Sequence, residues 1–367
     1  MQAQVIHLNN REELMIDYQE VNHLHQTYAN FPFHLKHCVW ELTLACCFHC
    51  AYCGSSGGKA RDNELSTDEC LDIVGQLAEL GCRRVSLIGG EVFMRRDWDV
   101  ISEALIRNGI ITSIITNGYQ MTPEILQRLK ELRIESVAVS LDGPESVHDA
   151  FRQRGSYSRA MQTINAVADA GIPVSIITAL RSDNAPLLPE FFGIIRNLPI
   201  FAWQIQACSP MGNADKNGVS ISFDAGTVIR FVKSVNGTVP FYVGVADNIG
   251  YYTAEEPEIR GVQGRFFTGC TAGLKSIGID SVGNVRGCES MQDDSFNEGN
   301  LREKSLLSIW MDPNSFSYNR DFNDGLLTGS CKGCPKGNIC AGGCRSYNYF
   351  TTGKLYQNPL CARNKVK

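Results

Sequence analysis

The sequence predicts an α/β protein whose amino-terminal half folds into an open partial barrel of six parallel strands. Short apolar segments alternate there with amphipathic segments, which is the pattern of parallel strands joined by crossover helices. Six strand–helix units are fewer than the eight of a closed barrel, so this barrel should stay open. The strands are expected near residues 39–44, 84–88, 112–116, 136–141, 174–178 and 202–206.

The first crossover helix has the clearest start signal. Ser66 is its expected N-cap, and Glu69 stands three residues later at the capping-box position. Apolar residues then recur at helical spacing, at Leu71, Val74, Leu77 and Leu80. Further along, residues 224–235 predict another helix, and residues 276–280 and 284–286 predict a hairpin around a Ser-Val-Gly turn.

Composition narrows the classes of function. The chain has 367 residues with 43% apolar content, which is enough for a large core, and its net charge of -5 with dispersed Lys and Arg argues against nucleic-acid binding. No apolar run reaches the length of a membrane span, and the first residues show no signal-peptide core. We therefore expect a cytoplasmic enzyme without nucleic-acid or membrane partners, whose fifteen cysteines are not paired as disulfides.

Three cysteines follow the first predicted strand. Cys46, Cys50 and Cys53 form a C-x3-C-x2-C run that offers three thiolates to a metal centre. A centre with three protein ligands keeps one position for a small molecule, whereas structural zinc sites are closed. Zinc is nevertheless an alternative, because C-x2-C spacing is common in structural zinc sites.

The second predicted strand ends in Gly89-Gly90-Glu91. Bare glycine backbone lets a ligand approach closely, and the carboxylate of Glu91 can accept hydrogen bonds from an ammonium group. The strand end is therefore a candidate ligand site beside the three cysteines.

Seven further cysteines lie in the last third of the chain. Cys270 is followed by twelve residues, Gly283, four residues and Cys288. The others are spaced as Cys331-x2-Cys334-x5-Cys340-x3-Cys344-x16-Cys361.

These motifs resemble the radical S-adenosylmethionine (SAM) superfamily and its SPASM extension. Two motifs carry the resemblance to the superfamily: the cysteine triplet, with Tyr52 between its last two members, and Gly89-Gly90-Glu91. The sequence departs from the family at Val92, where a proline is common. The resemblance implies a partial (β/α)6 radical SAM barrel followed by a small cysteine-rich SPASM domain, with three [4Fe-4S] clusters and SAM as cofactors. Cys46, Cys50 and Cys53 would then bind the first cluster, Glu91 the SAM amine, and Tyr52 would lie near adenine.

The resemblance also implies an interleaved ligand pattern for two auxiliary clusters. Four cysteines would close the second auxiliary cluster: Cys331, Cys334, Cys340 and Cys361. Three would hold the first: Cys270, Cys288 and Cys344. Its fourth site would be open to substrate, solvent or a side chain such as Glu289.

Residues at the other strand ends are further candidates, because functional residues gather at the carboxyl ends of barrel strands. Asn117 ends the third strand. The resemblance implies that Ser140 and Asp142 contact the SAM ribose and that Arg181 contacts the SAM carboxylate, with backbone and turn contacts as the structural alternative. Cys208 belongs to no cluster motif and is either a buried packing residue or a hydrogen-atom donor, as in peptide epimerases of the superfamily.

The function implied by the resemblance is reductive cleavage of SAM to a 5'-deoxyadenosyl radical that abstracts a substrate hydrogen. SPASM relatives mostly act on peptides, so the leading hypothesis is ribosomal-peptide maturation by an oxidative cross-link or related oxidation. Expected partners are a peptide substrate, an external electron donor such as ferredoxin or flavodoxin, and a separate leader-recognition protein. The alternatives are a peptide epimerase using Cys208, a sulfatase-type maturase, a small-molecule oxidase of the haem-pathway kind, and a non-enzymatic zinc or iron-sulfur scaffold.

Four segments are expected along the chain. Residues 1–37 form an amino-terminal extension, residues 38–215 the barrel, residues 216–262 a bridging region, and residues 263–367 the SPASM domain.

Overall fold

The structure is a computed structural model that describes residues 28–260 and 266–365, so most of the expected amino-terminal extension lies outside the described residues. Six parallel strands build the first part, as the sequence predicts, with ends shifted by a few residues. They are β1 (His37–Glu41), β2 (Arg84–Ile88), β3 (Ile111–Thr116), β4 (Ser136–Ser140), β5 (Val174–Leu180) and β6 (Ala202–Ala207). Neighbours in the chain pair in parallel, from His37 opposite Arg84 to Leu180 opposite Ala207.

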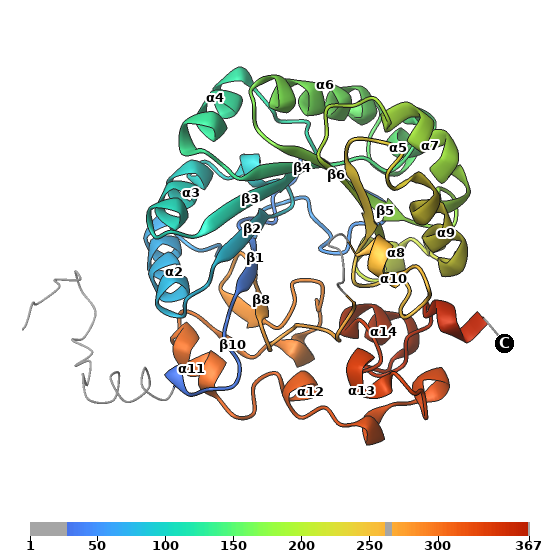
Figure 1. Cartoon of the computed structure of the whole chain (residues 1–367). Helices are drawn as coiled ribbons and strands as arrows, with labels where there is room; N and C mark the ends of the chain where they lie inside the picture. Colours follow the sequence, from blue (N-terminus) through green and yellow to red (C-terminus); the bar gives the residue numbers. More distant parts are fainter. Residues whose placement is uncertain (1–27, 261–265, 366–367) are drawn as a thin grey trace, which may run out of the picture.

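The sheet continues beyond these six strands on both sides. Its order is β10-β9-β8-β1-β2-β3-β4-β5-β6-β7. β7 (Tyr242–Val245) pairs in parallel with β6, and β8 (Ser276–Ile279) pairs in parallel with β1. Figure 1 shows the strands arranged around the centre of the molecule. Both additions are four-residue strands, too short to carry a pattern distinct from a loop.

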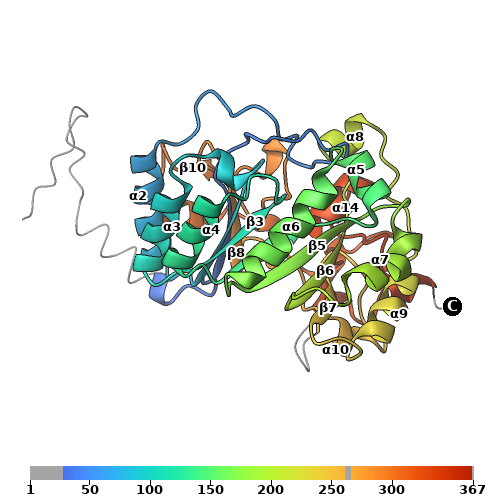
Figure 2. The ribbon, with the colours of Figure 1, turned by 90° about the horizontal axis from the view of Figure 1, so that it is seen from above.

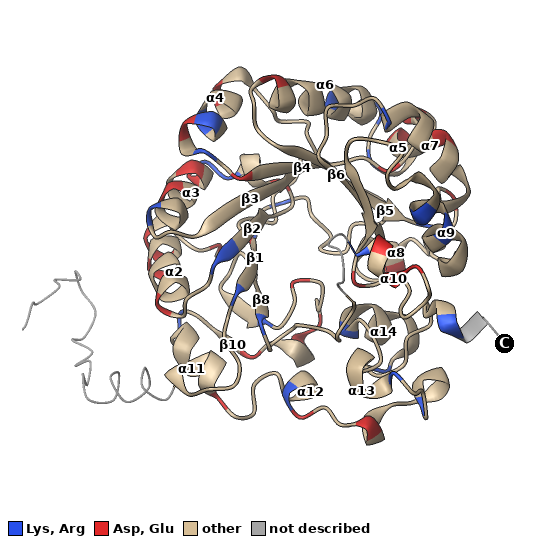
Figure 3. Ribbon diagram, viewed as in Figure 1, with Lys and Arg blue, Asp and Glu red and all other residues tan. Residues whose placement is uncertain are grey.

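Helices cover the outside of the barrel (Figure 1). They are α2 (Thr67–Glu79), α3 (Trp98–Arg107), α4 (Pro123–Leu132), α5 (Glu145–Phe151), α6 (Ser156–Asp169), α7 (Leu188–Ile195) and α9 (Ala225–Val235). The single turns α8 (Asn213–Lys216) and α10 (Glu256–Ile259) lie in connecting segments. The predicted capping box is confirmed, since Ser66 and Glu69 exchange both side-chain-to-backbone hydrogen bonds. Acidic and basic residues are interspersed over these helices (Figure 3).

The two faces of the strands differ. Trp40, Leu87 and Trp203 are fully buried in the apolar core. On the other face, His37 Nε2 lies 3.1 Å from Ser86 Oγ, which lies 3.1 Å from Ser113 Oγ. Because strand side chains alternate between faces, these three polar side chains line the inside of the barrel.

The carboxyl-terminal region, residues 266–365, has short elements. β8 and β9 (Asn284–Arg286) form the predicted antiparallel hairpin, which β10 (Gly299–Asn300) extends. The helices are α11 (Leu306–Met311), α12 (Ser317–Arg320), α13 (Gly337–Cys340) and α14 (Arg345–Thr352). Figure 1 shows α13 and α14 on the opposite side of the ring from α4, and Figure 2 shows the molecule from above, with α2, α3 and α4 on one side and α7 and α9 on the other.

None of the helices in the described ranges combines the length and the apolar character needed to cross a membrane.

Candidate active site

The three cysteines of the C-x3-C-x2-C run lie in the loop after β1, which we call the cluster loop (residues 45–58). Cys46 Sγ accepts a hydrogen bond from the backbone N–H of Phe48 at 3.4 Å, and Cys53 Sγ accepts one from Gly57 at 3.3 Å. Cys50 is buried in the apolar cluster that Cys46 and Cys53 also contact. Backbone N–H groups aimed at sulfur stabilise thiolates and are a means by which proteins tune iron-sulfur clusters, so this loop fits a cluster.

Gly89 and Gly90 are needed for a reason that the sequence did not reveal. A Cβ atom at Gly90 would lie 2.4 Å from the carbonyl oxygen of Ala45, and one at Gly89 would lie 2.6 Å from that of Thr43. The backbone N–H groups of Gly90 and Glu91 donate to these same carbonyls, each at 2.7 Å. The glycines therefore let the strand end pack directly against the start of the cluster loop.

Glu91 is buried at this junction, with 1% of its surface exposed. Its carboxylate accepts hydrogen bonds from Thr116 Oγ1 at 2.7 Å and from the backbone N–H of Asn117 at 2.8 Å. Burial raises the pKa of Glu91 to about 7 despite these donors. The Asn117 side chain lies 3.8 Å from Cys46 Sγ and 3.5 Å from Cys47 Sγ, so it joins the strand end to the cluster loop.

A buried ionic group lies on the other side of the cluster loop. The Tyr52 hydroxyl donates to Asp142, and Arg152 Nε donates to the same carboxylate at 2.7 Å. The Arg181 guanidinium lies 4.6 Å from the centre of the Tyr52 ring, within cation–π range. Burial alone would raise the pKa of Asp142, but Arg152, His148 and Arg181 outweigh it and hold that pKa well below its usual range.

These contacts define where three of the predicted SAM-binding residues lie. Asp142 also accepts a hydrogen bond from the backbone N–H of Ala179 at 3.0 Å, so both of its oxygens contact the protein. Arg181 is fully buried and forms a two-point ion pair with Asp183 at 3.0 and 3.1 Å. Ser140 is partly buried at the end of β4. Their roles toward SAM stay predictions.

Arg152 and His148 were missed by sequence reasoning. His148 lies in the middle of α5 and Arg152 is its C-cap, and the short amphipathic run of this helix gives no sign that a basic residue turns inward. His148 Nδ1 accepts from the backbone N–H of Asp142 at 3.1 Å, and burial lowers its pKa to about 4. His148 is therefore neutral near pH 7 and positions the strand end.

Cys208 follows β6 and packs against the cluster loop. It is 6% exposed and belongs to the same apolar cluster as Phe48, Cys50 and Tyr52. Its pKa is raised to about 12, mainly by burial, so it is a thiol and not a thiolate. The structure thus places Cys208 beside the predicted SAM site, and a donor role stays a prediction.

Residues after Cys208 hold the cluster loop in place. Asn213 donates its backbone N–H to the carbonyl of Cys53 at 2.8 Å and its side-chain amide to that of Cys50 at 3.1 Å. Asn217 donates to the carbonyl of Ala51 at 2.9 Å. The sequence suggested a domain boundary at these residues. Their role in holding the cluster loop appears only in hydrogen bonds to residues that are far away in the sequence.

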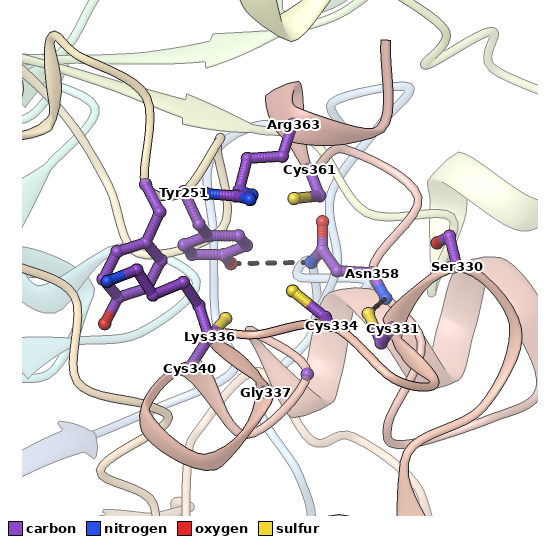
Figure 4. A pocket seen from close by; sticks show the side chains of 12 residues that line it. Tyr251, Ser330, Cys331, Cys334, Lys336, Gly337, Cys340, Asn358, Cys361 and Arg363 are labelled. Carbon is purple, nitrogen blue, oxygen red and sulfur yellow. Dashed lines mark hydrogen bonds between the residues drawn. The ribbon is translucent and has the colours of Figure 1, made fainter. Parts of the chain in front are cut away.

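The carboxyl-terminal cysteines gather in two places. Cys331, Cys334, Cys340 and Cys361 line one pocket, and Figure 4 shows their sulfur atoms around a common space. Cys270, Cys288 and Cys344 form the other group. Burial is the largest cause that raises the pKa of both Cys288 and Cys344, and the nearby charge of Cys270 raises the pKa of both further. Their assignment as cluster ligands stays a prediction.

Glu289, the candidate fourth ligand, accepts a hydrogen bond from Gln292 Nε2 at 2.8 Å through one oxygen. Its other oxygen is buried without a hydrogen-bond partner among the described residues.

The spacing within the cysteine groups bears on the zinc alternative. In the described part of the chain, no three His, Cys, Asp or Glu side chains are placed to coordinate a single metal ion. Ligands of one zinc ion must converge on that ion, whereas each iron of a cluster takes its own thiolate.

Comparisons with known proteins agree with this geometry. The sequence profile of the "Radical SAM superfamily" matches residues 40–190, and that of an "Iron-sulfur cluster-binding domain", SPASM, matches residues 270–335.

Relatives extend the similarity over most of the chain. The AdoMet-dependent heme synthase of Methanosarcina barkeri is 27% identical over 337 residues, which cover 88% of this chain and 95% of that protein. The PqqA peptide cyclase of Rhizobium meliloti is 26% identical over 334 residues, covering 89% and 87%. Streptococcus suis SuiB, in a crystal structure with its precursor peptide SuiA, shares the fold with a TM-score of 0.73 at 17% identity, over 97% of this chain and 84% of that one. The chain is thus an enzyme of the radical SAM superfamily with a carboxyl-terminal SPASM domain, and its cofactors are iron-sulfur clusters and SAM.

Proposed function

We propose that the protein holds three [4Fe-4S] clusters and uses SAM to oxidise a peptide, by a cross-link or a related two-electron step. The observation that supports this most is the separation of the cysteines into the open three-cysteine loop and two further groups in the carboxyl-terminal region. One cluster suffices to cleave SAM. Two more suit removal of an electron from the substrate after hydrogen abstraction.

The residues of the chain would bind and orient the cofactors. Cys46, Cys50 and Cys53 would hold the first cluster, which supplies hydrogen-atom abstraction when SAM is bound. Glu91 presents a buried carboxylate for the amine of SAM, and Tyr52 is held by Asp142 on the other side of the loop. The buried surroundings keep water from the reacting groups.

Ser140, Asp142 and Arg181 would complete the SAM site by contacts to its ribose and carboxylate. Because Asp142 and Arg181 already have protein partners, their contacts to SAM would be shared with Tyr52 and Asp183.

A peptide substrate is supported by the likeness to PqqA peptide cyclase along nearly the whole chain. The reaction would need an external one-electron donor such as ferredoxin or flavodoxin. A separate protein would recognise the leader segment of the substrate.

The test is turnover of the anaerobically reconstituted protein with SAM, dithionite and short peptides encoded beside its gene. We expect 5'-deoxyadenosine and a peptide product that has lost two hydrogens, both measured by mass spectrometry. Formation of 5'-deoxyadenosine with an unchanged peptide mass and a new D-residue would instead establish the epimerase, with Cys208 as donor.

A small-molecule oxidase is the second candidate, because a heme synthase is 27% identical over 88% of this chain. Incubation with the porphyrin-type substrates of haem formation separates the two. Conversion of such a compound, without any peptide modification, would favour this candidate.

A further inference from the structure

Three buried polar side chains lie between the two groups of carboxyl-terminal cysteines. Tyr251, Asn348 and Asn358 are each at most 1% exposed. Polar groups at such depth are costly unless they are hydrogen-bonded, and a satisfied network fixes one arrangement of its members. None of the three belongs to a cysteine motif.

Hydrogen bonds through Tyr251 and Asn358 run continuously from one cysteine group to the other. The backbone N–H of Cys344 donates to the Tyr251 hydroxyl at 3.1 Å. The side-chain amide of Asn358 donates to the same oxygen at 3.5 Å, as Figure 4 shows. The backbone N–H of Asn358 donates to Cys331 Sγ at 3.4 Å. One end of this route is thus a sulfur atom in the four-cysteine pocket, and the other is the backbone of a cysteine in the three-cysteine group.

A second branch supports the same connection. Asn358 Nδ2 donates to Asn348 Oδ1 at 2.8 Å. Asn348 belongs to α14, and its backbone N–H donates to the carbonyl of Cys344 at 3.0 Å. Asn358 is therefore the member common to both branches, whereas Tyr251 belongs to one.

The surroundings of the two cysteine groups differ. The segment around the four-cysteine pocket includes the exposed residues Lys332 and Ile339. The other group lies beside Ala272 and Met291, which are 2% and 0% exposed. The exposed segment gives a one-electron carrier in solution a surface next to the four-cysteine pocket.

We propose that Tyr251 and Asn358 form the route by which one electron passes between the two auxiliary clusters. Cys270, Cys288 and Cys344 would hold the cluster that gives up one electron, and Cys331, Cys334, Cys340 and Cys361 would hold the cluster that takes it. No proton would leave the network, and an external one-electron acceptor would take the electron from the four-cysteine site. This inference rests on the proposed function, because it needs both auxiliary clusters to be present.

The test uses protein in which Cys46, Cys50 and Cys53 are replaced by Ala, so that only auxiliary clusters remain. The protein is reduced, freed of reductant and mixed with oxidised benzyl viologen, and the two reduced clusters are followed by freeze-quench EPR. We expect two signals that disappear one after the other, first that of the four-cysteine site and then that of the three-cysteine site. Tyr251→Phe should slow the loss of the second signal, the second phase, several-fold. Asn358→Ala should slow it further, because both branches are then lost.

The control is Tyr356→Phe, which removes a 3.0 Å hydrogen bond to the carbonyl of Tyr318 in the same region but none on the route. Tyr251→Phe keeps the ring that packs 4.4 Å from Phe267, so iron content should not change. An unchanged second phase in both route variants would overturn the proposal, and so would equal slowing in the control. Absence of two signals before any route substitution would overturn the three-cluster assignment itself.

Discussion

The cluster loop and the last cysteine segment, residues 321–361, hold their cysteines by different means. The cluster loop lies against strand ends, and Glu91, Asn213 and Asn217 all donate hydrogen bonds to its carbonyls. The last segment has only α13 and single helical turns before α14 begins. The barrel therefore builds its cysteine site from the protein alone, whereas the last segment has little regular structure to fix its four-cysteine pocket.

Removal of iron should have the largest effect, and it should act differently on the two cysteine sites. A site that does not form without metal draws part of its folding free energy from metal binding. We expect limited proteolysis of the apo protein to cut within residues 321–361 and to leave the barrel intact, while the holo protein resists. Resistance of that segment in both forms would show that it folds without clusters.

Loss of Asp142 should damage the barrel site itself. Asp142→Ala leaves Arg152 buried without its carboxylate partner, at a cost of about 3–5 kcal/mol. The exposed ion pair of Arg84 and Glu135 offers a control, since Glu135→Ala should cost at most about 1 kcal/mol. Urea unfolding under anaerobic conditions measures both, and equal midpoints for the two variants would contradict the ionic role given to Asp142.

Much of the fold could be predicted from the sequence, because these features depend on local residue patterns. The Ser66 cap, the strands and the 276–286 hairpin each depend on residues close together in the chain. The ionic group around Asp142 could not be predicted, because Arg152 acquires its role only when α5 folds back over β4. Tyr251 and Asn358 lie more than a hundred residues apart, and nothing in their neighbourhoods marks them as partners.

The pH dependence of SAM binding tests the role of the Glu91 carboxylate at the end of β2. Glu91 has a pKa of about 7, so it becomes protonated in the free site as the pH falls through that value. An amine that binds the carboxylate favours its charged form. The affinity for SAM should therefore rise with pH, by at most about tenfold per pH unit, and level off above about pH 7. Glu91→Gln should flatten this dependence in an equilibrium binding titration. The same slope in the variant would exclude Glu91 as its source.

Replacement of Cys208 should have the smallest effect. Cys208→Ala removes one sulfur from an apolar cluster and should leave 5'-deoxyadenosine formation and an oxidative product unchanged. Product analysis by mass spectrometry, with chiral analysis of the amino acids, gives the answer. Loss of product with continued 5'-deoxyadenosine formation would favour the epimerase.

The central claim is that the cluster loop cleaves SAM while the carboxyl-terminal cysteines hold separate clusters. The most direct measurement compares iron content and 5'-deoxyadenosine formation in the wild type and in the Cys46→Ala, Cys50→Ala, Cys53→Ala triple variant, both under dithionite. We expect the variant to lose about one third of its iron and all SAM cleavage, because one of three four-iron clusters is gone. Continued 5'-deoxyadenosine formation, or loss of all iron, would contradict it.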